Sequence, residues 1–218
     1  MKFILLILAL LPIAAVADLP KTFSTAKKVA AGIYADHQTS FYCGCDYSKV
    51  GKKLVPDHKS CGYSPRKEVK RSARIEWEHV VPAWAFGHQL QCWQEGGRKN
   101  CKKNNPQFKL MEADLMNLVP AVGEINGNRS NYSFAMLEGE PRVYGACDFE
   151  VDFKARKAEP APEVRGDIAR IYFYMQEKYG MHISKKQMQL FLAWDRQGPI
   201  DDWEREKLAR ISAIEAKE

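Results

Sequence analysis

Outside its N-terminus the sequence has no apolar run of about 18 residues, which excludes a protein that crosses a membrane several times. It also lacks internal repeats, low-complexity tracts and a Ser/Gly linker, so neither a repeat protein nor a disordered tail protein is indicated. Hydrophobic residues make up 45% of the chain and charged residues 28%, as in ordinary globular proteins. A chain of 218 residues can form one good-sized core, and we expect a single domain.

The N-terminus has the form of a secretory signal peptide. Residues 3–16 are almost purely apolar after a single lysine, and the run ends in the small-x-small sequence Ala15-Val16-Ala17. This pattern predicts a signal peptide over residues 1–17 that is cleaved before Asp18. An uncleaved membrane anchor is the alternative, but the run is short for a membrane span. We therefore expect an exported protein, periplasmic or secreted, whose mature part covers residues 18–218 and has no membrane segment.

Six cysteines, an even number, lie in that mature part, and an oxidising compartment favours three disulfides among them. Cys92 and Cys101 close a short loop and are the pair we predict first. Cys43 and Cys45 are too close for easy mutual bridging, so each is expected to pair elsewhere. A zinc site is not favoured, because the chain has no C-x-x-C pair. The predicted disulfide cysteines are Cys43, Cys45, Cys61, Cys92, Cys101 and Cys147.

Positive charge is concentrated in residues 52–109, which carry thirteen Lys and Arg against five Asp and Glu, whereas the whole chain has a net charge of +6. Such a region is typical of a protein that binds a polyanion. Solvated loops with no binding role are the alternative, but ordinary surfaces intersperse acids among their bases. The residues predicted to contact a nucleic-acid backbone are Arg66, Lys67, Lys70, Arg71, Arg74, Lys99, Lys102 and Lys103.

Hydrophobic periodicity and capping residues predict an α+β fold, rich in helix, with few short strands. Residues 38–72 and 83–114 have no clear pattern and are expected to be irregular. Residues 157–163 resemble a linker that is too short to separate two domains. The expected strands are 74–81, 115–119 and 147–154. The expected helices are 22–37, 121–131, 162–179, 185–197 and one that begins at Asp201.

Two short segments combine residues suited to phosphodiester chemistry. Glu78 and His79 lie at the end of the expected strand 74–81, and residues 117–131, which are rich in amide and acid side chains, extend from the second strand onto the expected helix. A carboxylate and an amide oxygen are ligands for a hard cation, and an imidazole can accept a proton near neutral pH. The order strand, loop, strand and helix is typical of a ββα unit that places a base beside a metal.

Several longer motifs resemble those of the bacterial endonuclease I family. Its members are periplasmic or secreted non-specific nucleases of the ββα-metal (His-Me finger) type. The resemblance covers essentially the whole mature chain, with the ββα-metal core expected around residues 74–131. The motifs that carry it are residues 78–82 (EHVVP), 114–120 (DLMNLVP), 123–131 (GEINGNRSN), 165–170 (RGDIAR) and 203–205 (WER).

The resemblance implies a Mg²⁺-dependent, sequence-non-specific endonuclease that cleaves DNA, and RNA as well, to 5′-phosphate products. His79 would be the general base, and Glu78 and Asn126 would bind one Mg²⁺, a site that Ca²⁺ or Mn²⁺ can also occupy. Arg98 would stabilise charge on the phosphate, and Glu112 would lie behind the site and position its residues without contacting the metal or the phosphate. Double- and single-stranded DNA are the expected partners of a monomeric enzyme.

Two other functions fit parts of the sequence. An exported, disulfide-rich nucleic-acid-binding protein without catalysis would keep the basic region and need neither Glu78 nor His79. A phosphodiesterase for small nucleotides would not need so large a basic region.

Neighbouring residues of a strand point to opposite faces, so Glu78 and His79 should not face one site from a regular strand. We therefore expect an irregularity at residues 78–80, and a straight strand through both residues would count against their shared role.

Overall fold

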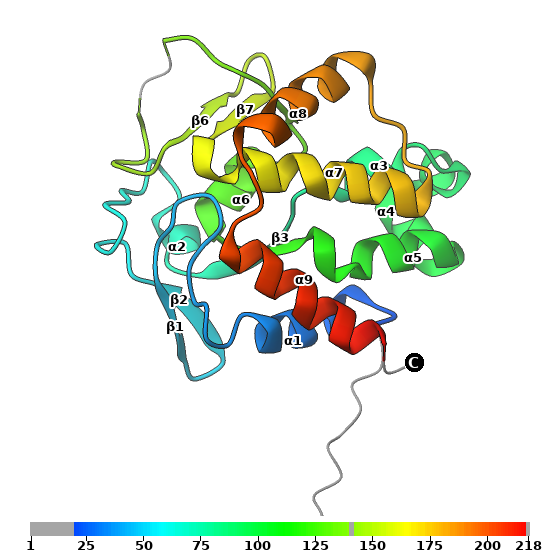
Figure 1. Cartoon of the computed structure of the whole chain (residues 1–218), viewed down its shortest axis with the longest axis horizontal. Helices are drawn as coiled ribbons and strands as arrows, with labels where there is room; N and C mark the ends of the chain where they lie inside the picture. Colours follow the sequence, from blue (N-terminus) through cyan, green and yellow to red (C-terminus); the bar gives the residue numbers. More distant parts are fainter. Residues whose placement is uncertain (1–19, 140–141, 217–218) are drawn as a thin grey trace, which may run out of the picture.

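The computed structural model describes residues 20–139 and 142–216, in which helices predominate (Figure 1). The predicted signal peptide, residues 1–17, lies outside the described residues. Within the described part, no helix has both the length and the apolar character needed to span a membrane. The helices are α1 (Phe23–Ile33), α2 (Val69–Ser72), α3 (Ala83–Gly87), α4 (Gln91–Asn104), α5 (Pro106–Ala113), α6 (Gly123–Arg129), α7 (Arg165–Tyr179), α8 (Lys185–Gln197) and α9 (Asp202–Glu215), with short 3-10 turns η1 (Leu115–Asn117) and η2 (Pro162–Val164).

The strands are short and form three small sheets in the described residues. One sheet is the hairpin of β1 and β2, and the second is the antiparallel pair β3 and β4. In the third, β7 lies between β5, to which it is parallel, and β6, to which it is antiparallel. The strands are β1 (Tyr47–Val50), β2 (Lys53–Pro56), β3 (Ile75–His79), β4 (Leu118–Val122), β5 (Ser133–Phe134), β6 (Phe149–Asp152) and β7 (Lys157–Pro160).

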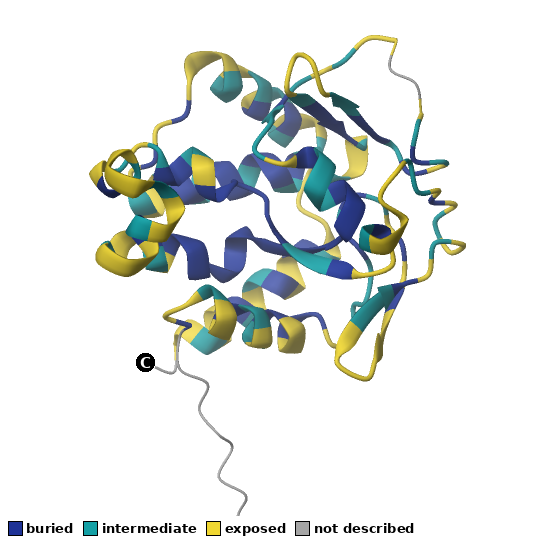
Figure 2. Cartoon of the chain, turned by 180° about the vertical axis from the view of Figure 1, so that it is seen from behind, coloured by how far each residue is buried: buried dark blue, intermediate teal, exposed yellow. Residues whose placement is uncertain are grey.

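The helices and strands enclose a core that runs through the middle of the molecule. Figure 2 shows buried residues concentrated at the centre and exposed ones on the outer turns of the helices. The larger buried cluster includes Val119 of β4, Ile125 of α6, Ile168 of α7 and Phe191 of α8. A second cluster joins α1, η1 and α9 beneath it. The ribbon of β3 and β4, with α6 directly after it, lies between these clusters, which makes it a rigid support for side chains.

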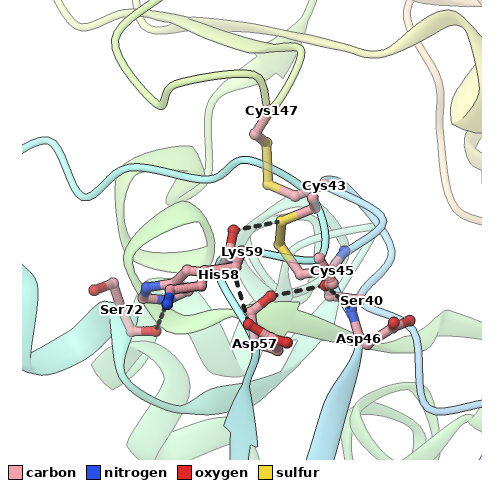
Figure 3. The surroundings of a disulfide bond; sticks show 11 residues. Ser40, Cys43, Cys45, Asp46, Asp57, His58, Lys59, Ser72 and Cys147 are labelled. Atoms are coloured by element: carbon pink, nitrogen blue, oxygen red, sulfur yellow. Dashed lines mark hydrogen bonds between the residues drawn. A yellow bond between two sulfur atoms is a disulfide. The ribbon is translucent and has the colours of Figure 1, made fainter.

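Three disulfides fasten the irregular segments to this core. Cys92 pairs with Cys101, which confirms the pair predicted from spacing. Cys43 pairs with Cys147 across 104 residues of sequence, and Cys45 pairs with Cys61. Figure 3 shows the neighbouring Cys43 and Cys45 directed to different partners. The expectation that these two cysteines would not pair with each other is therefore confirmed.

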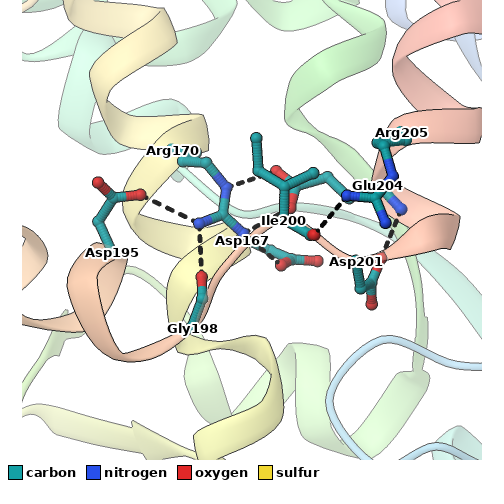
Figure 4. Close-up of polar contacts among 8 residues, drawn as sticks. All are labelled: Asp167, Arg170, Asp195, Gly198, Ile200, Asp201, Glu204 and Arg205. Atoms are coloured by element: carbon teal, nitrogen blue, oxygen red, sulfur yellow. Dashed lines mark hydrogen bonds and ion pairs between the residues drawn. The ribbon is translucent and has the colours of Figure 1, made fainter.

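A partly buried arginine joins the C-terminal helices (Figure 4). The guanidinium of Arg170 on α7 forms ion pairs with Asp167 on the same helix, Asp195 on α8 and Glu204 on α9. It also donates a hydrogen bond of 2.6 Å to the carbonyl of Gly198. Two of the motifs found in the sequence, residues 165–170 and 203–205, therefore meet in one contact that holds the helices together.

The C-terminal helices match their sequence predictions closely. Ser184 and Asp201 accept hydrogen bonds from the third residues of α8 and α9, and Gly180 ends α7 in the left-handed conformation. Thr22, one of the two capping residues that the sequence offers beside Ser24, caps α1, but that helix ends at Ile33 and not near His37.

The prediction that residues 38–72 and 83–114 are irregular was wrong, because both segments contain regular secondary structure. Residues 38–72 contain β1, β2 and α2, residues 83–114 contain α3, α4 and α5, and the linker-like segment forms β7 and η2. These elements are short or are held by disulfides, so their sequences show little periodicity.

The predicted strand 115–119 was also displaced, since residues 115–117 form η1 and β4 continues through Pro120. The carbonyl of Pro120 accepts a hydrogen bond from the amide of Phe41, so the proline nitrogen lies on the outer edge of the ribbon, where no strand needs a donor.

Candidate functional site

A cavity of about 500 Å³ lies along the open edge of β3. Every residue from Arg74 to His79 borders it, although neighbouring side chains of a strand point to opposite faces. Among the described strands, β3 is hydrogen-bonded only to β4, so its other edge is unpaired. Side chains from both faces of an edge strand can reach one cavity that follows that edge. Glu78 and His79 therefore both border this cavity.

The irregularity expected at residues 78–80 does not bring them together. β3 pairs with β4 in regular register, with Glu78 opposite Val119 and His79 opposite Leu118, and the chain bends only from Val80 onward. The expectation assumed that a shared site must lie on one face of the strand. That assumption fails here because the ribbon has only two strands and leaves the edge of β3 open.

The imidazole of His79 is buried at the end of β3. Its Nε2 lies 2.8 Å from the backbone carbonyl oxygen of Glu112, and because a carbonyl only accepts hydrogen bonds, Nε2 carries the hydrogen. Nδ1 is therefore the nitrogen that can accept a proton. Burial lowers the pKa of His79 to about 4, so the ring is neutral at neutral pH. Phe23 packs against it with ring centroids 4.6 Å apart and restricts its orientation.

Glu112 supports two side chains of the site at once. Its backbone carbonyl orients His79, and its side chain, 2% exposed, accepts a hydrogen bond of 2.7 Å from Nε of Arg98. Nζ of Lys102 lies 3.6 Å from the other carboxylate oxygen. The guanidinium of Arg98 is about half exposed and borders the cavity. One residue of α5 thus places a base and an arginine next to each other.

Arg98 owes its place to a break in α4. Gly96 and Gly97 interrupt the helix, and Gly97 has φ +63°, a conformation that other residues rarely adopt. The disulfide between Cys92 and Cys101 joins the two arms of the broken helix, one on each side of Arg98. The segment from 92 to 101 is therefore a closed loop that presents Arg98 to the cavity.

The carboxylate of Glu78 is almost completely buried. Its Oε1 accepts a hydrogen bond of 3.4 Å from the hydroxyl of Tyr42 and lies 3.5 Å from Nε of Arg129. Burial raises the pKa of Glu78 to about 7, although the positive charge of Arg129 acts in the opposite direction. Arg129 is fully buried, donates to the carbonyl of Val80, and has no hydrogen-bond acceptor at Nε. Arg129 is thus a support for Glu78 and not a surface contact.

Asn126 of α6 is oriented by a carboxylate. Its Nδ2 donates a hydrogen bond of 3.1 Å to Oε2 of Glu76, which directs the amide oxygen away from Glu76. Glu76 also accepts hydrogen bonds from Arg71 and Arg74. Burial alone would raise the pKa of Glu76, but these two arginines outweigh it and lower the pKa. Glu76 is therefore charged and fixed, and it determines which end of the amide of Asn126 is available as a ligand.

Glycine lets α6 approach α2 closely enough for this network. A Cβ at Gly127 would lie 2.1 Å from Nη1 of Arg71. A larger residue would displace the arginine that holds Glu76. This contact explains a glycine that is unfavourable in a helix on propensity alone.

The basic segment before β3 is anchored by Glu124. Its carboxylate accepts hydrogen bonds from the hydroxyl of Tyr63 and from the backbone amides of Arg66, Lys67 and Glu68. Burial would raise the pKa of Glu124, but these four donors outweigh it and lower the pKa. Glu124 therefore positions the start of α2 rather than facing the cavity.

The predicted backbone-contacting bases are only partly brought together. Arg71 and Arg74 border the cavity beside Arg98, and Lys102 lies close behind at Glu112. Arg66 instead covers the ring of Phe153, with its guanidinium carbon 4.3 Å from the ring centroid. The other four, which do not border the cavity, are exposed: Lys67, Lys70, Lys99 and Lys103.

Sequence reasoning missed several residues of the site. Glu76 could have been found, because it is two positions before Glu78 and shares its strand face. Phe23 and Lys27 of α1 also border the cavity, as does Ser130 at the end of α6. No sequence signal connects α1 with β3, since they are about fifty residues apart and meet only in the folded chain.

Glu78 and Asn126 are the residues that could hold a metal ion. One carboxylate and one amide oxygen suit a hard cation that shares its coordination with water and substrate. A cation bound to Glu78 would also stabilise the charged form of this carboxylate, which burial disfavours. In the described residues, no group of three or more His, Cys, Asp and Glu side chains is arranged to bind a metal.

Comparison with known proteins points to one family. The Endonuclease I family model matches residues 21–218. A periplasmic deoxyribonuclease of Aeromonas hydrophila is 54% identical over 196 residues, which cover 89% of this chain and 82% of the relative. An extracellular deoxyribonuclease of the same species is 52% identical over 91% of this chain and 86% of the relative. Endonuclease-1 of Buchnera aphidicola (subsp. Acyrthosiphon pisum) is 47% identical over 86% of this chain and 76% of the relative.

Proposed function

The chain belongs to the endonuclease I family, and from this premise we propose that it is an exported, Mg²⁺-dependent, sequence-non-specific endonuclease for DNA and RNA. The observation that carries the proposal is the hydrogen bond from His79 to the carbonyl of Glu112, which leaves Nδ1 as the proton acceptor beside Glu78, Asn126 and Arg98. A base, a candidate metal site and an arginine around one cavity are what phosphodiester hydrolysis requires.

His79 acts as the general base. Because burial lowers its pKa to about 4, the imidazole is unprotonated across the neutral range and can take a proton from an attacking water. The hydrogen bond from Nε2 to the carbonyl fixes the tautomer and the ring orientation. The carbonyl also stabilises the imidazolium that forms when the proton is taken.

Glu78 and Asn126 would hold the Mg²⁺, and Ca²⁺ or Mn²⁺ could occupy the same site. When bound, the ion polarises the phosphoryl oxygen and stabilises the leaving 3′-oxygen, which gives 5′-phosphate products. Glu76 keeps the amide oxygen of Asn126 available, and Arg129 together with Tyr42 holds Glu78 in place. These residues determine the direction of the two ligand oxygens before any ion arrives.

Arg98 stabilises the negative charge that develops on the phosphate. Its Nε is held by Glu112, so its terminal nitrogens remain available for a phosphate oxygen. The guanidinium is about half exposed, which leaves it accessible to substrate. Arg71 and Arg74 border the same cavity and contribute to binding of the neighbouring phosphates.

Recognition through phosphates explains the lack of sequence preference. Phosphate contacts carry no base information, and they make binding fall steeply as salt rises. We propose export because relatives are named periplasmic and extracellular deoxyribonucleases, and we propose that the enzyme acts as a monomer.

A plasmid-nicking assay on the oxidised mature protein tests the proposal. It compares Mg²⁺ with EDTA, and the wild-type protein with His79→Ala at matched DNA binding. We expect cutting only by the wild type with Mg²⁺. DNA binding without cutting under any divalent ion would instead support a nucleic-acid-binding protein without catalysis.

A further inference from the structure

A second hollow, of about 710 Å³, lies between α1 and the β1–β2 hairpin, which are next to each other at the lower edge of the molecule in Figure 1. This groove and the catalytic cavity adjoin, because four residues border both of them: Lys27, Arg74, Ile75 and Trp77. The proposed mechanism uses no residue that belongs to the groove alone.

The groove is lined by positive charge without a compensating acid. Its wall contains no Asp or Glu, and in the described residues its five lysines form no ion pair with a carboxylate. Two come from α1 and three from the hairpin. They are Lys27, Lys28, Lys49, Lys52 and Lys53. Five cations around one hollow repel one another, and an anionic ligand would relieve that repulsion.

The floor of the groove is apolar and leads to the general base. Tyr34, Tyr47 and Trp77 contribute to it, with the rings of Tyr34 and Trp77 5.6 Å apart. At the near end, Nζ of Lys27 lies 4.9 Å from the ring centroid of Phe23, the same ring that packs on His79. A cationic rim suits the phosphates of a nucleic-acid strand, and Trp77, the one of these three rings that is not buried, offers a surface to a base.

We propose that this groove binds the part of the nucleic-acid strand that flanks the scissile phosphate, with Lys49, Lys52 and Lys53 of the hairpin contacting its backbone. The proposal rests on the function proposed above. It assigns a binding track to α1 and β1–β2, which contain none of the residues predicted from the sequence to contact a nucleic-acid backbone. An acidic peptide is a less suitable ligand, because the groove continues into a cavity equipped for phosphate.

The groove extends along β3 away from His79. Ile75 borders the groove and His79 lies four residues further, about 13 Å at the usual rise of a strand. A nucleic-acid strand that runs from the cavity into the groove therefore places phosphates on one side of the bond that is cut along the groove. A tetranucleotide has few phosphates beside the bond that is cut, so it contacts fewer of the groove's lysines than a 20-mer does.

A matched pair of triple variants tests the proposal. The first is Lys49→Gln/Lys52→Gln/Lys53→Gln, and the control is Lys154→Gln/Lys185→Gln/Lys186→Gln, which removes the same charge from exposed lysines on the β6–β7 turn and α8. Binding of a fluorescent single-stranded 20-mer is measured in EDTA at several salt concentrations, so that no cleavage is needed. Cleavage of the 20-mer and of a tetranucleotide is then compared with Mg²⁺.

We expect the hairpin variant to bind the 20-mer about 10- to 100-fold more weakly than the control variant, and its salt slope to fall by about 2. Its preference for the 20-mer over the tetranucleotide in kcat/KM should fall by a similar factor. Equal losses in both triple variants, or equal losses on both substrates, would overturn the proposal. If the hairpin variant lost affinity only for a polyglutamate probe, the groove would be a peptide site instead. A wild-type protein that binds but never cuts would refute the proposed nuclease function and leave the EDTA measurement as the test of the groove.

Discussion

Removal of the disulfide between Cys92 and Cys101 should reduce catalysis more, and stability less, than removal of the disulfide between Cys43 and Cys147. The bridge closes a loop with a sequence separation of 9, and the chain-entropy relation gives about 2.6 kcal/mol for a loop of that size. The same relation gives about 4.7 kcal/mol for the bridge between Cys43 and Cys147, whose separation is 104. For a domain of this size these losses lower Tm by about 5–10 °C and about 9–19 °C, respectively.

The two bridges differ in what they hold. The first joins the two arms of the broken helix α4 on either side of Arg98, whereas the second fastens a loop that does not border the cavity. Without the first bridge, Arg98 keeps its hydrogen bond to Glu112, but the loop that contains it is no longer closed. The orientation of its guanidinium is then less well fixed. We expect Cys92→Ala/Cys101→Ala to lower kcat about 10- to 100-fold at a temperature where it is fully folded, with a much smaller change in the Cys43→Ala/Cys147→Ala variant.

Melting curves by circular dichroism and steady-state cleavage of a 20-mer measure the two effects separately, on variants purified with their remaining bridges oxidised. A Cys92→Ala/Cys101→Ala protein with wild-type kcat below its Tm would refute the reasoning, because the loop would then place Arg98 without the bridge. A larger loss of kcat in the Cys43→Ala/Cys147→Ala variant would refute it as well. If the result is as expected, full reduction should abolish activity, which would keep the precursor harmless in the cytoplasm.

Three further results follow from the site. Because burial raises the pKa of Glu78 to about 7 in the metal-free protein, protons compete with Mg²⁺ below that pH, and the apparent Mg²⁺ affinity should fall about tenfold per pH unit on acidification. Calorimetric titration at pH 6 and 8 checks this, and equal affinities would contradict it. Glu76→Gln weakens control over the amide of Asn126 and should reduce Mg²⁺ affinity about 10- to 100-fold, whereas a change in KM for DNA alone would assign Glu76 to substrate binding. Asn117→Ala removes two buried hydrogen bonds to the backbone of Val81 and should destabilise the protein by about 2–5 kcal/mol in urea unfolding, and a loss below about 1 kcal/mol would show that water replaces them.

The local sequence determined the features that depend on neighbouring residues. Thr22, Ser184 and Asp201 cap helices because a short polar side chain needs only the amides that follow it. The pairing of Cys92 with Cys101 followed from their short separation. Residue type and strand position already indicated Glu78 and His79, whereas the family motif alone singled out Asn126. All three side chains border one cavity.

Only the tertiary structure decided how these residues cooperate. The sequence suggested that Glu78 and His79 could not share a site on a regular strand, but the open edge of a two-stranded ribbon lets both faces reach one cavity. The base is oriented by the backbone carbonyl of Glu112, and a carbonyl has no sequence signature because every residue has one. Phe23 of α1 and the hairpin lysines reach the site through folding alone, since long-range packing, which no local pattern encodes, brings α1 and β1–β2 to the edge of β3.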